Sequence, residues 1–467
     1  MAHQQNPQLY VIVLAAGKGT RMKSSIPKVL HTLAGKPMIG HVLDNVDVLK
    51  PSGVFVICGH GADQLKQWAA NDQRDLIWVE QKEQLGTGHA VRIAMQALND
   101  AGVGATDRVL IVSGDVPLTP TSVLQELCTQ TSAFALLTVI LSNPFGYGRI
   151  LRNQQQQVVG VVEEKDSNDQ QRLINEVNTN VMVLEYGTLQ ELVPLIQNNN
   201  TQGEYYLPDL VGLATQRHYK IVAVQASHDW EVQGVNDRVQ LEQLERTFQK
   251  NQVHELMKQG LGVVDSQRLD VRGTLKFGQD CKIDINAIFE GQNELGDTVS
   301  IGQNVRLVNT KIGNNVAILS FCDIEGAIIG DNCTVGPFAR LRCDAVLESK
   351  AKIGNFVELK KSILHVGAKV NHLAYVGDCE IGRGSNIGAG TILCNYDGVS
   401  KHQTTIGDEV FVGSNCSLVA PLAIGDGATV GAGSVVTTNV PADCLAVGRV
   451  KPSIIKGWKR PKKDQIK

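Results

Sequence analysis

The first half of the chain alternates short apolar runs with amphipathic segments. Four apolar runs have the length of buried strands, and two segments with helical spacing lie between them: Tyr10–Leu14, Val54–Cys58, Val109–Val112, Ala135–Leu141, and then Lys36–Leu49 and Gly88–Leu98. This alternation predicts an α/β domain with an open, mostly parallel, Rossmann-like sheet. Ligands of such sheets bind beyond the carboxyl ends of the strands.

A different pattern begins near residue 237. Residues 237–257 contain neither glycine nor proline, and Val239, Leu241, Leu244 and Phe248 lie near helical spacing. We expect one long helix there, which either connects two domains or closes the first. The predicted boundaries are 1–238 for the first domain, 239–259 for the linker helix and 260–467 for the second domain.

From about residue 275 onward an apolar residue recurs every sixth position, often followed by glycine. Ile283 and Phe289 begin this series, and from Leu295 onward the pattern is [LIV]-G-x-x-x-x, as at Leu295, Ile301, Ile329, Val335, Ile353, Ile381, Ile387, Ile406, Val412, Ile424 and Val430. One aliphatic side chain per six residues points into a narrow core, and three hexapeptides close one triangular coil. The period therefore predicts a left-handed parallel β-helix.

The period of six is interrupted in two places. The apolar positions in the first place lie 13, 10 and 5 residues apart: Ile353, Val366, Val376 and Ile381. We expect irregular coils there. Ile406 follows Ile387 by 19 residues, which predicts a loop at Thr391–Thr405. Such loops often line the binding face of a solenoid.

Composition agrees with two soluble domains. Among 467 residues, 46 are glycine, 43% are hydrophobic and 19% are charged, and the glycine excess fits a repeat with a turn in each period. A net charge of −3 gives a nucleic-acid partner no electrostatic support. Met1–Gln8 lacks the order of a signal peptide, and runs such as Tyr10–Ala16 are too short to cross a bilayer. We expect a cytoplasmic protein with no membrane span.

The ten cysteines are scattered between Cys58 and Cys444 without a C-x-x-C pair. We interpret them as small buried apolar residues, and expect neither disulfides nor a metal site from them.

A glycine-rich string follows the first predicted strand. Leu14-Ala15-Ala16-Gly17-Lys18-Gly19-Thr20-Arg21-Met22 leads to Pro27-Lys28. Small residues there let backbone N–H groups approach phosphate oxygens, and Arg21 and Lys28 can neutralise charge on a transferring phosphate. The string resembles the signature of the sugar-phosphate nucleotidyltransferases. The alternative is a surface turn with two solvated cations.

A histidine in the repeat region is the candidate for a second chemistry. Histidine is the side chain whose pKa suits a general base near neutral pH. His372 lies in the string Lys369-Val-Asn-His-Leu-Ala-Tyr375-Val-Gly-Asp378, within the interrupted stretch. His365 is the competing candidate, and either histidine alone could be structural.

Further strings occur in order along the chain. They are Gln84-Leu-Gly-Thr-Gly-His-Ala, Ser113-Gly-Asp115, Gly146-Tyr-Gly-Arg149, Val162-Glu163, Asn178-Thr and Gly234-Val-Asn236. With the β-helix and the His372 string, the chain resembles the bacterial bifunctional N-acetylglucosamine-1-phosphate uridyltransferases/glucosamine-1-phosphate N-acetyltransferases over its whole length. The resemblance implies two reactions that together make UDP-N-acetylglucosamine.

For the uridylyl site the resemblance implies catalytic roles for Arg21 and Lys28 and Mg²⁺ held by Asp115 and Asn236. Nucleotide and sugar are bound by a larger set: Leu14, Ala15, Ala16, Gly17, Lys28, Gln81, Gly86, Thr87, Ser113, Gly114, Asp115, Gly148, Glu163, Asn178 and Asn236. The simpler alternatives are helix caps for Asp115 and Asn236 and a surface charge for Glu163. Mg²⁺ prefers hard oxygen ligands and leaves the remaining positions to phosphates and water.

For the acetyl site the resemblance implies His372 as the base and two further groups of residues. The acceptor sugar is bound by Arg342, Lys360, Tyr375 and Asn386, and acetyl-CoA by Ala389, Asn395, Tyr396, Ser414, Ala432 and Arg449. Alanines at such positions are also ordinary β-helix corners. The basic tail Lys456–Lys463 either contacts cofactor phosphates or is solvated. The family also implies a homotrimer formed through the β-helix.

Three positions depart from the family pattern. Ser113 replaces a common tyrosine, Asn180 replaces a usual glycine, and Cys343-Asp344 follows Arg342 where proline and glycine are common. Two other functions stay open. The β-helix could be purely regulatory, as in proteins that resemble the ADP-glucose pyrophosphorylases, or the chain could be a non-enzymatic nucleotide-sugar sensor. Those pyrophosphorylases lack the His372–Tyr375 and Asn395–Gly398 strings.

Overall fold

The structure is a computed structural model that describes residues 7–460. Contacts between Cα atoms divide it into two compact units, of which the first ends at Phe248 and the second begins at Gln249. Most of Met1–Gln8 and the tail residues from Pro461 to Lys463 lie outside the described residues.

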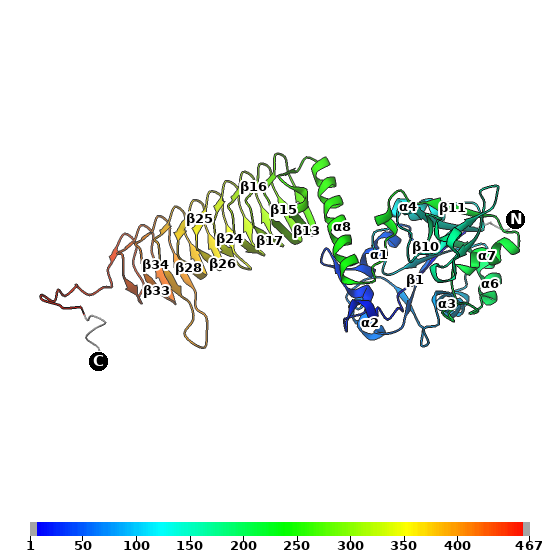
Figure 1. Cartoon of the computed structure of the whole chain (residues 1–467). Coiled ribbons are helices and arrows are strands. Elements are labelled where there is room, and N and C mark those ends of the chain that lie inside the picture. The colour runs from blue at the N-terminus through cyan, green and yellow to red at the C-terminus, as the bar shows by residue number, and fades with distance from the viewer. Residues whose placement is uncertain (1–6, 461–467) are drawn as a thin grey trace, which may run out of the picture. The chain divides into compact units, whose positions relative to one another are not determined.

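The first unit is built on a mixed sheet with the strand order β11-β7-β10-β6-β1-β4-β5, extended by β8 and β9 beside β10 (Figure 1). Its strands are β1 (Leu9–Leu14), β4 (Gly53–Cys58), β5 (Leu76–Glu80), β6 (Arg108–Ser113), β7 (Phe134–Ile140), β8 (Arg149–Arg152), β9 (Val158–Val162), β10 (Glu176–Glu185) and β11 (Ile221–Gln225). A separate small hairpin joins β2 (Thr32–Leu33) to β3 (Lys36–Pro37).

The centre of this sheet is parallel, as the alternation of runs and helices predicts. β1 pairs in parallel with β4 and β6, and β4 with β5. The predicted α/β class is therefore confirmed. β10 is the exception, because it runs antiparallel to both β6 and β7.

Helices cover both faces of the sheet, because every central strand is apolar on both sides. In β1, Ile12 belongs to one core, with α3 (Thr87–Asp100), α6 (Tyr186–Leu192) and α7 (Asp209–Gln216). Val11 and Val13 face the other core, with α1 (Met38–Asp47), α2 (Ala62–Ala69) and α4 (Thr121–Cys128). A strand buried on both faces reads as a continuous apolar run, which is the pattern seen in the sequence. A short helix, α5 (Asp169–Arg172), precedes β10.

The long helix α8 (Arg238–Lys258) spans the boundary between the units. Leu244 is buried in a core of the first unit and Val253 in the core of the second. The side chain of Gln249 exchanges two hydrogen bonds with the backbone of Val271, with N–O distances of 2.8 and 3.2 Å. These bonds satisfy the backbone at the start of the solenoid.

The second unit is a stack of coils whose strands all pair in parallel (Figure 1). One sheet contains β12 (Gly262–Val263), β14 (Lys282–Ile283), β16 (Ser300–Ile301), β19 (Ala317–Ile318), β22 (Thr334–Val335), β25 (Lys352–Asn355), β27 (Lys369–His372), β29 (Asn386–Ile387), β32 (Phe411–Val412), β35 (Thr429–Val430) and β37 (Leu445–Ala446).

The other strands form a second continuous sheet that turns around the remaining sides. They are β13 (Leu269–Phe277), β15 (Ala287–Leu295), β17 (Arg306–Val308), β18 (Lys311–Ile312), β20 (Asp323–Glu325), β21 (Ile328–Ile329), β23 (Arg340–Leu341), β24 (Val346–Leu347), β26 (Glu358–Leu364), β28 (Tyr375–Ile381), β30 (Ile392–Cys394), β31 (Thr404–Ile406), β33 (Ser417–Val419), β34 (Leu422–Ile424) and β36 (Val435–Val436).

The aliphatic positions that repeat in sequence form the core of this stack. Ile283 pairs with Ile301 one coil later, and Ile301 pairs with Ile318. All three side chains are at most 3% exposed. The left-handed parallel β-helix predicted from the period of six is confirmed.

The expectation of irregular coils before His372 is wrong. The buried residue of that coil is Leu364, at 0% exposure, and Val366 is 38% exposed. Leu364 pairs with Leu347 and with Ile381 in regular ladders. Leu364 and Val366 lie two residues apart. Because Val366 was assigned to the core in place of Leu364, a single five-residue step looked like a break in the period of six. His372 therefore lies in a regular strand, β27.

The predicted loop is present but shorter. β30 and β31 extend over both ends of Thr391–Thr405 and leave residues 395–403 as the loop. Ile381 pairs with Ile406 across this coil, 25 positions later, whereas Ile363 pairs with Glu380 at 17. The extra residues leave the stack without disturbing the next coil.

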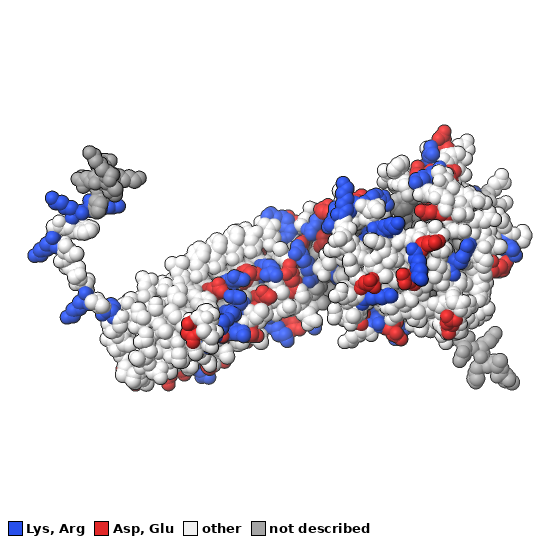
Figure 2. Space-filling view, turned by 90° about the horizontal axis from the view of Figure 1, so that it is seen from below, with Lys and Arg blue, Asp and Glu red and all other residues white. Residues whose placement is uncertain are grey.

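Acidic and basic side chains alternate in a band along the second unit (Figure 2). Ion pairs connect successive coils within the ladder Arg272–Glu290–Arg306–Asp323, with N–O distances of 2.8–3.0 Å. Exposed pairs of this kind each contribute little to stability.

The prediction for the cysteines holds in part. All ten lie in the described chain with free thiols, and six are buried. Cys343 and Cys444 are exposed, because they lie at corners of the solenoid, where side chains point outward. In residues 7–460 no cluster of three or more His, Cys, Asp or Glu side chains could hold a metal ion. Over the same residues no helix is long and apolar enough to cross a membrane.

Two candidate active sites

The loop after β1 borders a cleft of about 540 Å³ at the carboxyl ends of the parallel strands. Ten of the residues predicted for the uridylyl site line it: Leu14, Ala15, Ala16, Gly17, Lys28, Gln81, Gly86, Thr87, Ser113 and Asp115. Gly17 opens toward free space, since no heavy atom lies within 4 Å of an added Cβ. Of the other predicted residues, Gly114 is held beside this loop by a 2.9 Å bond from its N–H to the carbonyl of Leu14.

Sequence reasoning missed several residues of the same cleft. Lys18, Thr20, Gln84 and Glu204 line it as well. The first three lie inside the strings Leu14–Met22 and Gln84–Ala90, so their place in these strings was the available signal. Glu204 lies in no motif, and only the tertiary fold brings it to the cleft.

The Glu204 segment is held by the backbone of the loop before α3. The N–H of Tyr205 donates to the carbonyl of Leu85, and the N–H of Gly88 donates to the carbonyl of Tyr205, both at 2.8 Å. Gly86 has φ of +105°, and a Cβ there would lie 2.6 Å from the carbonyl oxygen of Tyr205. The position therefore requires glycine.

Gln81 is the most buried polar residue of this wall, at 4% exposure. Its side-chain Nε2 lies 3.2 Å from the carbonyl of Gly86 and 3.1 Å from Nδ1 of His89. These contacts fix the orientation of an amide that faces the cleft.

Lys28, Asp115 and Asn236 meet at one point. The Lys28 ammonium forms an ion pair with Asp115 Oδ2 and lies 3.1 Å from Asn236 Oδ1. The side chains of Lys28 and Asp115 are 14% and 20% exposed. Two hard oxygen atoms thus converge on one cation, here an ammonium ion. Such a donor pair fits Mg²⁺, whose other ligands are phosphate and water oxygens.

Neither Asp115 nor Asn236 uses its side-chain oxygen as a helix cap. β6 ends at Ser113 and the next helix begins only at Thr121, so Asp115 caps no helix. At α8 the capping bond comes from Asp237, whose Oδ1 accepts from the N–H of Gln240 at 2.9 Å. The side-chain oxygen of Asn236 is therefore available to a cation.

Arg21 is placed differently from Lys28. It lies in a short 3-10 helix, η1 (Thr20–Met22), with an exposed side chain. It is not among the residues that line the cleft.

Gly148, Glu163 and Asn178 form a second group, apart from the residues that line the cleft. The N–H of Asn178 donates to the carbonyl of Gly148 at 2.8 Å, and a Cβ on Gly148 would lie 2.9 Å from Glu163 Oε1. Glu163 borders a cavity of about 350 Å³. Burial, with Asp209 and Asp166 nearby, raises the pKa of Glu163. It is therefore not a solvated surface charge.

The fold explains the departure at Asn180. Its φ is +61°, at the bulge where the register of β10 shifts. Glycine adopts this conformation freely, and asparagine tolerates it better than most residues. The Asn180 side-chain oxygen accepts a 2.9 Å bond from Nδ2 of Asn178, so the replacement holds the Asn178 amide in place.

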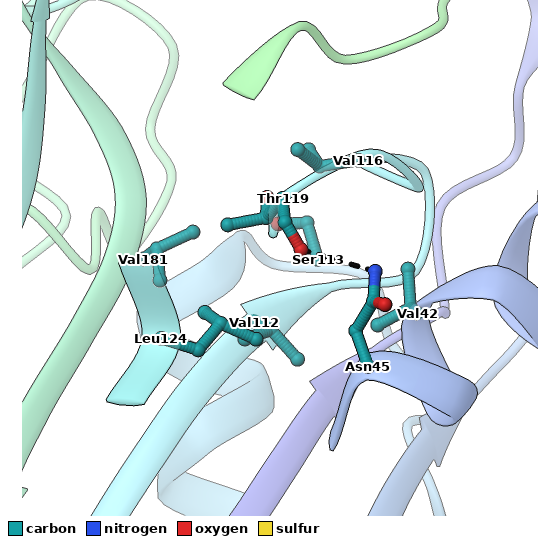
Figure 3. A pocket seen from close by; sticks show the side chains of 8 residues that line it. All are labelled: Val42, Asn45, Val112, Ser113, Val116, Thr119, Leu124 and Val181. Carbon is teal, nitrogen blue, oxygen red and sulfur yellow. Dashed lines mark hydrogen bonds between the residues drawn. The ribbon is translucent and has the colours of Figure 1, made fainter. Parts of the chain in front are cut away.

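Ser113 also borders a second, small pocket that is lined mostly by buried residues (Figure 3). Its volume of about 10 Å³ is space for one water molecule. Valine and leucine side chains surround it, and Asn45 bonds to the carbonyl of Thr119 at 3.0 Å. A tyrosine ring at this position is too large for the pocket and would extend into the cleft.

In the second unit, His372 ends β27 with an exposed side chain. Its Nδ1 is hydrogen-bonded to the side-chain oxygen of Asn355, the equivalent residue one coil earlier. An amide oxygen only accepts, so Nδ1 carries the proton and Nε2 is left as a base. Sequence reasoning missed Asn355. The available signal was its position 17 residues before His372, which is about one coil of the solenoid.

His365 is engaged with carboxylates. Its Nδ1 lies 3.1 Å from Glu348 Oε1 and its Nε2 lies 2.7 Å from Glu380 Oε1. Both contacts raise the pKa of His365. Neither ring nitrogen is left as a neutral base.

Three cations gather on the side of the second unit that contains β23, β26 and β28. The backbone N–H of Arg342 donates to the carbonyl of Leu359 at 2.9 Å, and Lys360 pairs with Gly377, so these residues stack over successive coils. Lys401, from loop 395–403, approaches Lys360 and with Arg342 lowers the pKa of Lys360. Positive charges held close together in this way favour the binding of an anion. Lys401 lies in no quoted string and was missed.

The departures around Arg342 leave its strand intact. Asp344 has φ of +64° at the corner, a conformation that aspartate tolerates without glycine. Tyr375 lies on the same face as the cations, and its hydroxyl lies over Gly377, where a Cβ would be 2.5 Å away. Asn386 accepts a long bond of 3.4 Å from Nδ2 of Asn371, the neighbour of His372.

The residues predicted to contact acetyl-CoA lie mostly in one row along a corner. Backbone bonds join Asn415 to Ala389 at 2.7 Å and Gly433 to Ser414 at 2.8 Å, and Arg449 reaches the carbonyl of Ala432 at 2.5 Å. The N–H of Gly390 donates to the carbonyl of His372 at 3.1 Å. The row therefore continues directly from His372.

Loop 395–403 is braced by its own side chains. Asp397 accepts bonds from the N–H groups of Val399 and Ser400 and contacts His402 Nε2 at 2.7 Å. These donors hold the pKa of Asp397 far below its usual range. Asn395 binds Asp378 Oδ2 at 2.5 Å, and Tyr396 remains 60% exposed.

Comparison with known proteins gives matches in both units. Residues 11–173 match the family model of the MobA-like NTP transferase domain. Residues 309–343 match the bacterial transferase hexapeptide (six repeats), and residues 403–438 match the hexapeptide repeat of succinyl-transferase.

Whole-length relatives are also found. The chain is 49% identical to the bifunctional protein GlmU of Acinetobacter baylyi over 455 residues, which are 97% of this chain and 98% of that protein. It is 48% identical to GlmU of Marinobacter nauticus, with 97% and 99% covered, and 50% identical to GlmU of Idiomarina loihiensis, with 97% and 98% covered.

Proposed function

Because the chain belongs to the family of the bifunctional protein GlmU, we propose that each of its two sites catalyses one step of UDP-N-acetylglucosamine synthesis. The second unit transfers acetyl from acetyl-CoA to glucosamine 1-phosphate. The first transfers uridylyl from UTP to the N-acetylglucosamine 1-phosphate that results. The observation that carries the proposal is that one chain contains both a cation-lined phosphate cleft and a histidine base beside an anion site.

In acetyl transfer, Nε2 of His372 removes a proton from the substrate amine, which attacks the thioester carbonyl, and CoA leaves as the thiol. The bond from Asn355 keeps the ring in the tautomer that this step needs. Arg342, Lys360 and Lys401 hold the phosphate of the acceptor. We place acetyl-CoA along the row from Ala389 to Arg449.

In uridylyl transfer, the phosphate of the sugar attacks the α-phosphorus of UTP and pyrophosphate leaves. No protein nucleophile is needed, so alignment and charge neutralisation are the work of the cleft. The loop from Leu14 to Lys18 and the ammonium of Lys28 contact the phosphates, and Gln81, Gly86 and Thr87 contact the base. Gly148, Glu163 and Asn178 hold the sugar. Arg21, which is exposed beside the loop, contributes by movement toward the phosphates.

We propose that Asp115 and Asn236 hold Mg²⁺ in this reaction. When bound, the ion neutralises phosphate charge in the transition state. Support comes from the convergence of their two oxygens on one cation.

We also propose a homotrimer formed through the β-helix, in a cytoplasmic protein. The flat outer faces of a solenoid support such an assembly. Sedimentation equilibrium of the full chain tests it, and a monomer at micromolar concentration would overturn it.

The decisive assay supplies purified protein with glucosamine 1-phosphate, acetyl-CoA, UTP and Mg²⁺, and measures CoA and pyrophosphate. Both products are expected. Pyrophosphate release from N-acetylglucosamine 1-phosphate without any CoA release would favour a regulatory β-helix, and release of neither would favour a sensor.

A further inference from the structure

The Lys28 ammonium occupies the position between the two oxygens assigned to the metal. It forms an ion pair with Asp115 Oδ2 and a 3.1 Å hydrogen bond to Asn236 Oδ1. Lys28 also lines the phosphate cleft, together with Gly17 and Lys18. One ammonium is thus within reach of two partners, the ligand pair and the substrate phosphates.

The oxygen pair is held in place independently of Lys28. The N–H of Val235 donates to the backbone carbonyl of Asp115 at 3.0 Å, which fixes the spacing of the two segments. The N–H of Asn236 donates to Gln240 Oε1 at 2.7 Å, which ties it to the first turn of α8. The backbone segments that carry the carboxylate and the amide therefore stay in place when the cation between them changes.

Lys28 is the mobile partner of the three. Its Cβ lies beside Gly19, where φ is +56° and an added Cβ would be 2.7 Å away. The base of the side chain is thus fixed against the loop, and the flexible four-carbon stem carries the charge. A rotation of the stem moves the ammonium without moving the backbone.

We propose that Lys28 is a placeholder cation, which a divalent metal ion displaces from Asp115 and Asn236 and which then turns to the nucleotide phosphates. Mg²⁺ binds oxygen at about 2.0–2.1 Å, so metal and ammonium cannot share these two ligands. In the resting protein the ammonium offsets the cost of a half-buried carboxylate. This inference rests on the proposed uridylyl-transfer function of the cleft.

The exchange couples metal and nucleotide binding. Without nucleotide, the metal must compete with Lys28, and its affinity is reduced. A nucleotide phosphate attracts Lys28 away from the ligand pair, and so raises the affinity for the metal by the same factor by which the metal raises affinity for the nucleotide.

The test measures Mn²⁺ binding to the full-length, nucleotide-free protein by electron paramagnetic resonance. Lys28→Met removes the competitor with little change in length, and we expect Mn²⁺ affinity to rise about tenfold, as for loss of a charged hydrogen bond. Lys18→Met is the matched control, since it removes an equal charge from the same cleft. It is expected to change the affinity less than threefold, roughly. Asp115→Ala identifies the site by abolishing the binding.

An unchanged or weaker Mn²⁺ affinity in Lys28→Met would overturn the proposal, as would an equal gain in Lys18→Met. A second measurement needs no variant. Reductive methylation of the native protein, followed by peptide mapping, should modify Lys28 faster when Mg²⁺ is present without nucleotide. Reactivity that Mg²⁺ leaves unchanged would equally contradict the exchange.

Neither experiment uses the substrates or measures turnover. If the chain proved unable to make UDP-N-acetylglucosamine, the competition for Asp115 and Asn236 would still be observed. If turnover were normal and Lys28→Met showed no gain, only the exchange would be excluded.

Discussion

The two units assemble their sites in opposite ways. In the first, Lys28 and Asn236 are 208 positions apart in sequence and meet over one half-buried carboxylate. In the second, Asn355 and His372 are equivalent residues of adjacent coils, 17 positions apart, and the histidine is exposed. A site that depends on the tertiary fold gains strong electrostatics in a shielded cleft. A site that depends on a repeat is local, and its parts can be changed one coil at a time.

The largest effect should be seen at the exposed site. His372→Ala removes the proposed base and should lower kcat for acetyl transfer by about 10²–10⁴-fold, while uridylyl transfer is retained. The measurement is CoA release with saturating glucosamine 1-phosphate. His365→Ala, seven residues away, is the control and should retain acetyl transfer. Near-normal acetylation by the His372 variant would show that the base lies elsewhere.

A substitution in the cleft of the first unit should affect uridylyl transfer and not acetyl transfer. Asp115→Ala removes a proposed metal ligand and leaves Lys28 without its carboxylate partner, so uridylyl transfer should fall by about 10²–10³-fold, the loss typical of one transition-state charge contact. Acetyl transfer should be unaffected. Uridylyl transfer is measured as pyrophosphate release from UTP and N-acetylglucosamine 1-phosphate. Asp75→Ala, at an exposed position, is the control. Loss of both activities would mean that the two sites are not independent.

Substitutions of two nearby aliphatic residues of the solenoid, Leu364 and Val366, should differ in their effect on stability. Leu364→Ala creates a cavity at a fully buried position and should lower the free energy of unfolding by about 2–5 kcal/mol. Val366→Ala, at 38% exposure, should cost less than about 1 kcal/mol. Urea unfolding followed by circular dichroism compares them. Equal losses would contradict the register described for this coil.

The smallest effect concerns pH. Because Glu348 and Glu380 raise the pKa of His365, the protonated ring stabilises the folded state. This stabilisation is complete below the unfolded pKa of about 6.5 and is lost as pH rises through the higher folded pKa. Calorimetry at acid pH should show His365→Gln about 1–3 °C below the parent protein in Tm. The difference should shrink at alkaline pH, and a constant difference would exclude the ionic contribution.

Local patterns explain how much was predictable from the sequence. The period of six fixes the solenoid because a single inward side chain per hexapeptide determines each turn. The strand runs fix the sheet because they are buried on both faces. The antiparallel direction of β10 was not predictable, since pairing direction depends on long-range contacts that leave no periodic trace.

The same contrast holds for the sites. Ten predicted residues line the cleft because the string after β1 and the string before α3 are each local. Glu204 and Lys401 were missed, since each reaches its site only through the path of a distant loop. The assignment of Val366 instead of Leu364 to the core was a local error, because two aliphatic side chains two residues apart, one inward and one outward, cannot be told apart without the register.

The row of corner residues that begins at His372 has a regular spacing along the solenoid axis. Ala389, Ser414, Ala432 and Arg449 follow it at one residue per coil. Since neighbouring strands are spaced by about 4.8 Å, Arg449 lies about 19 Å along the axis from the base. The reach available to an acyl carrier on this surface is thus counted in whole coils. Deleting one coil would shorten it by a single fixed step, and no intermediate length exists.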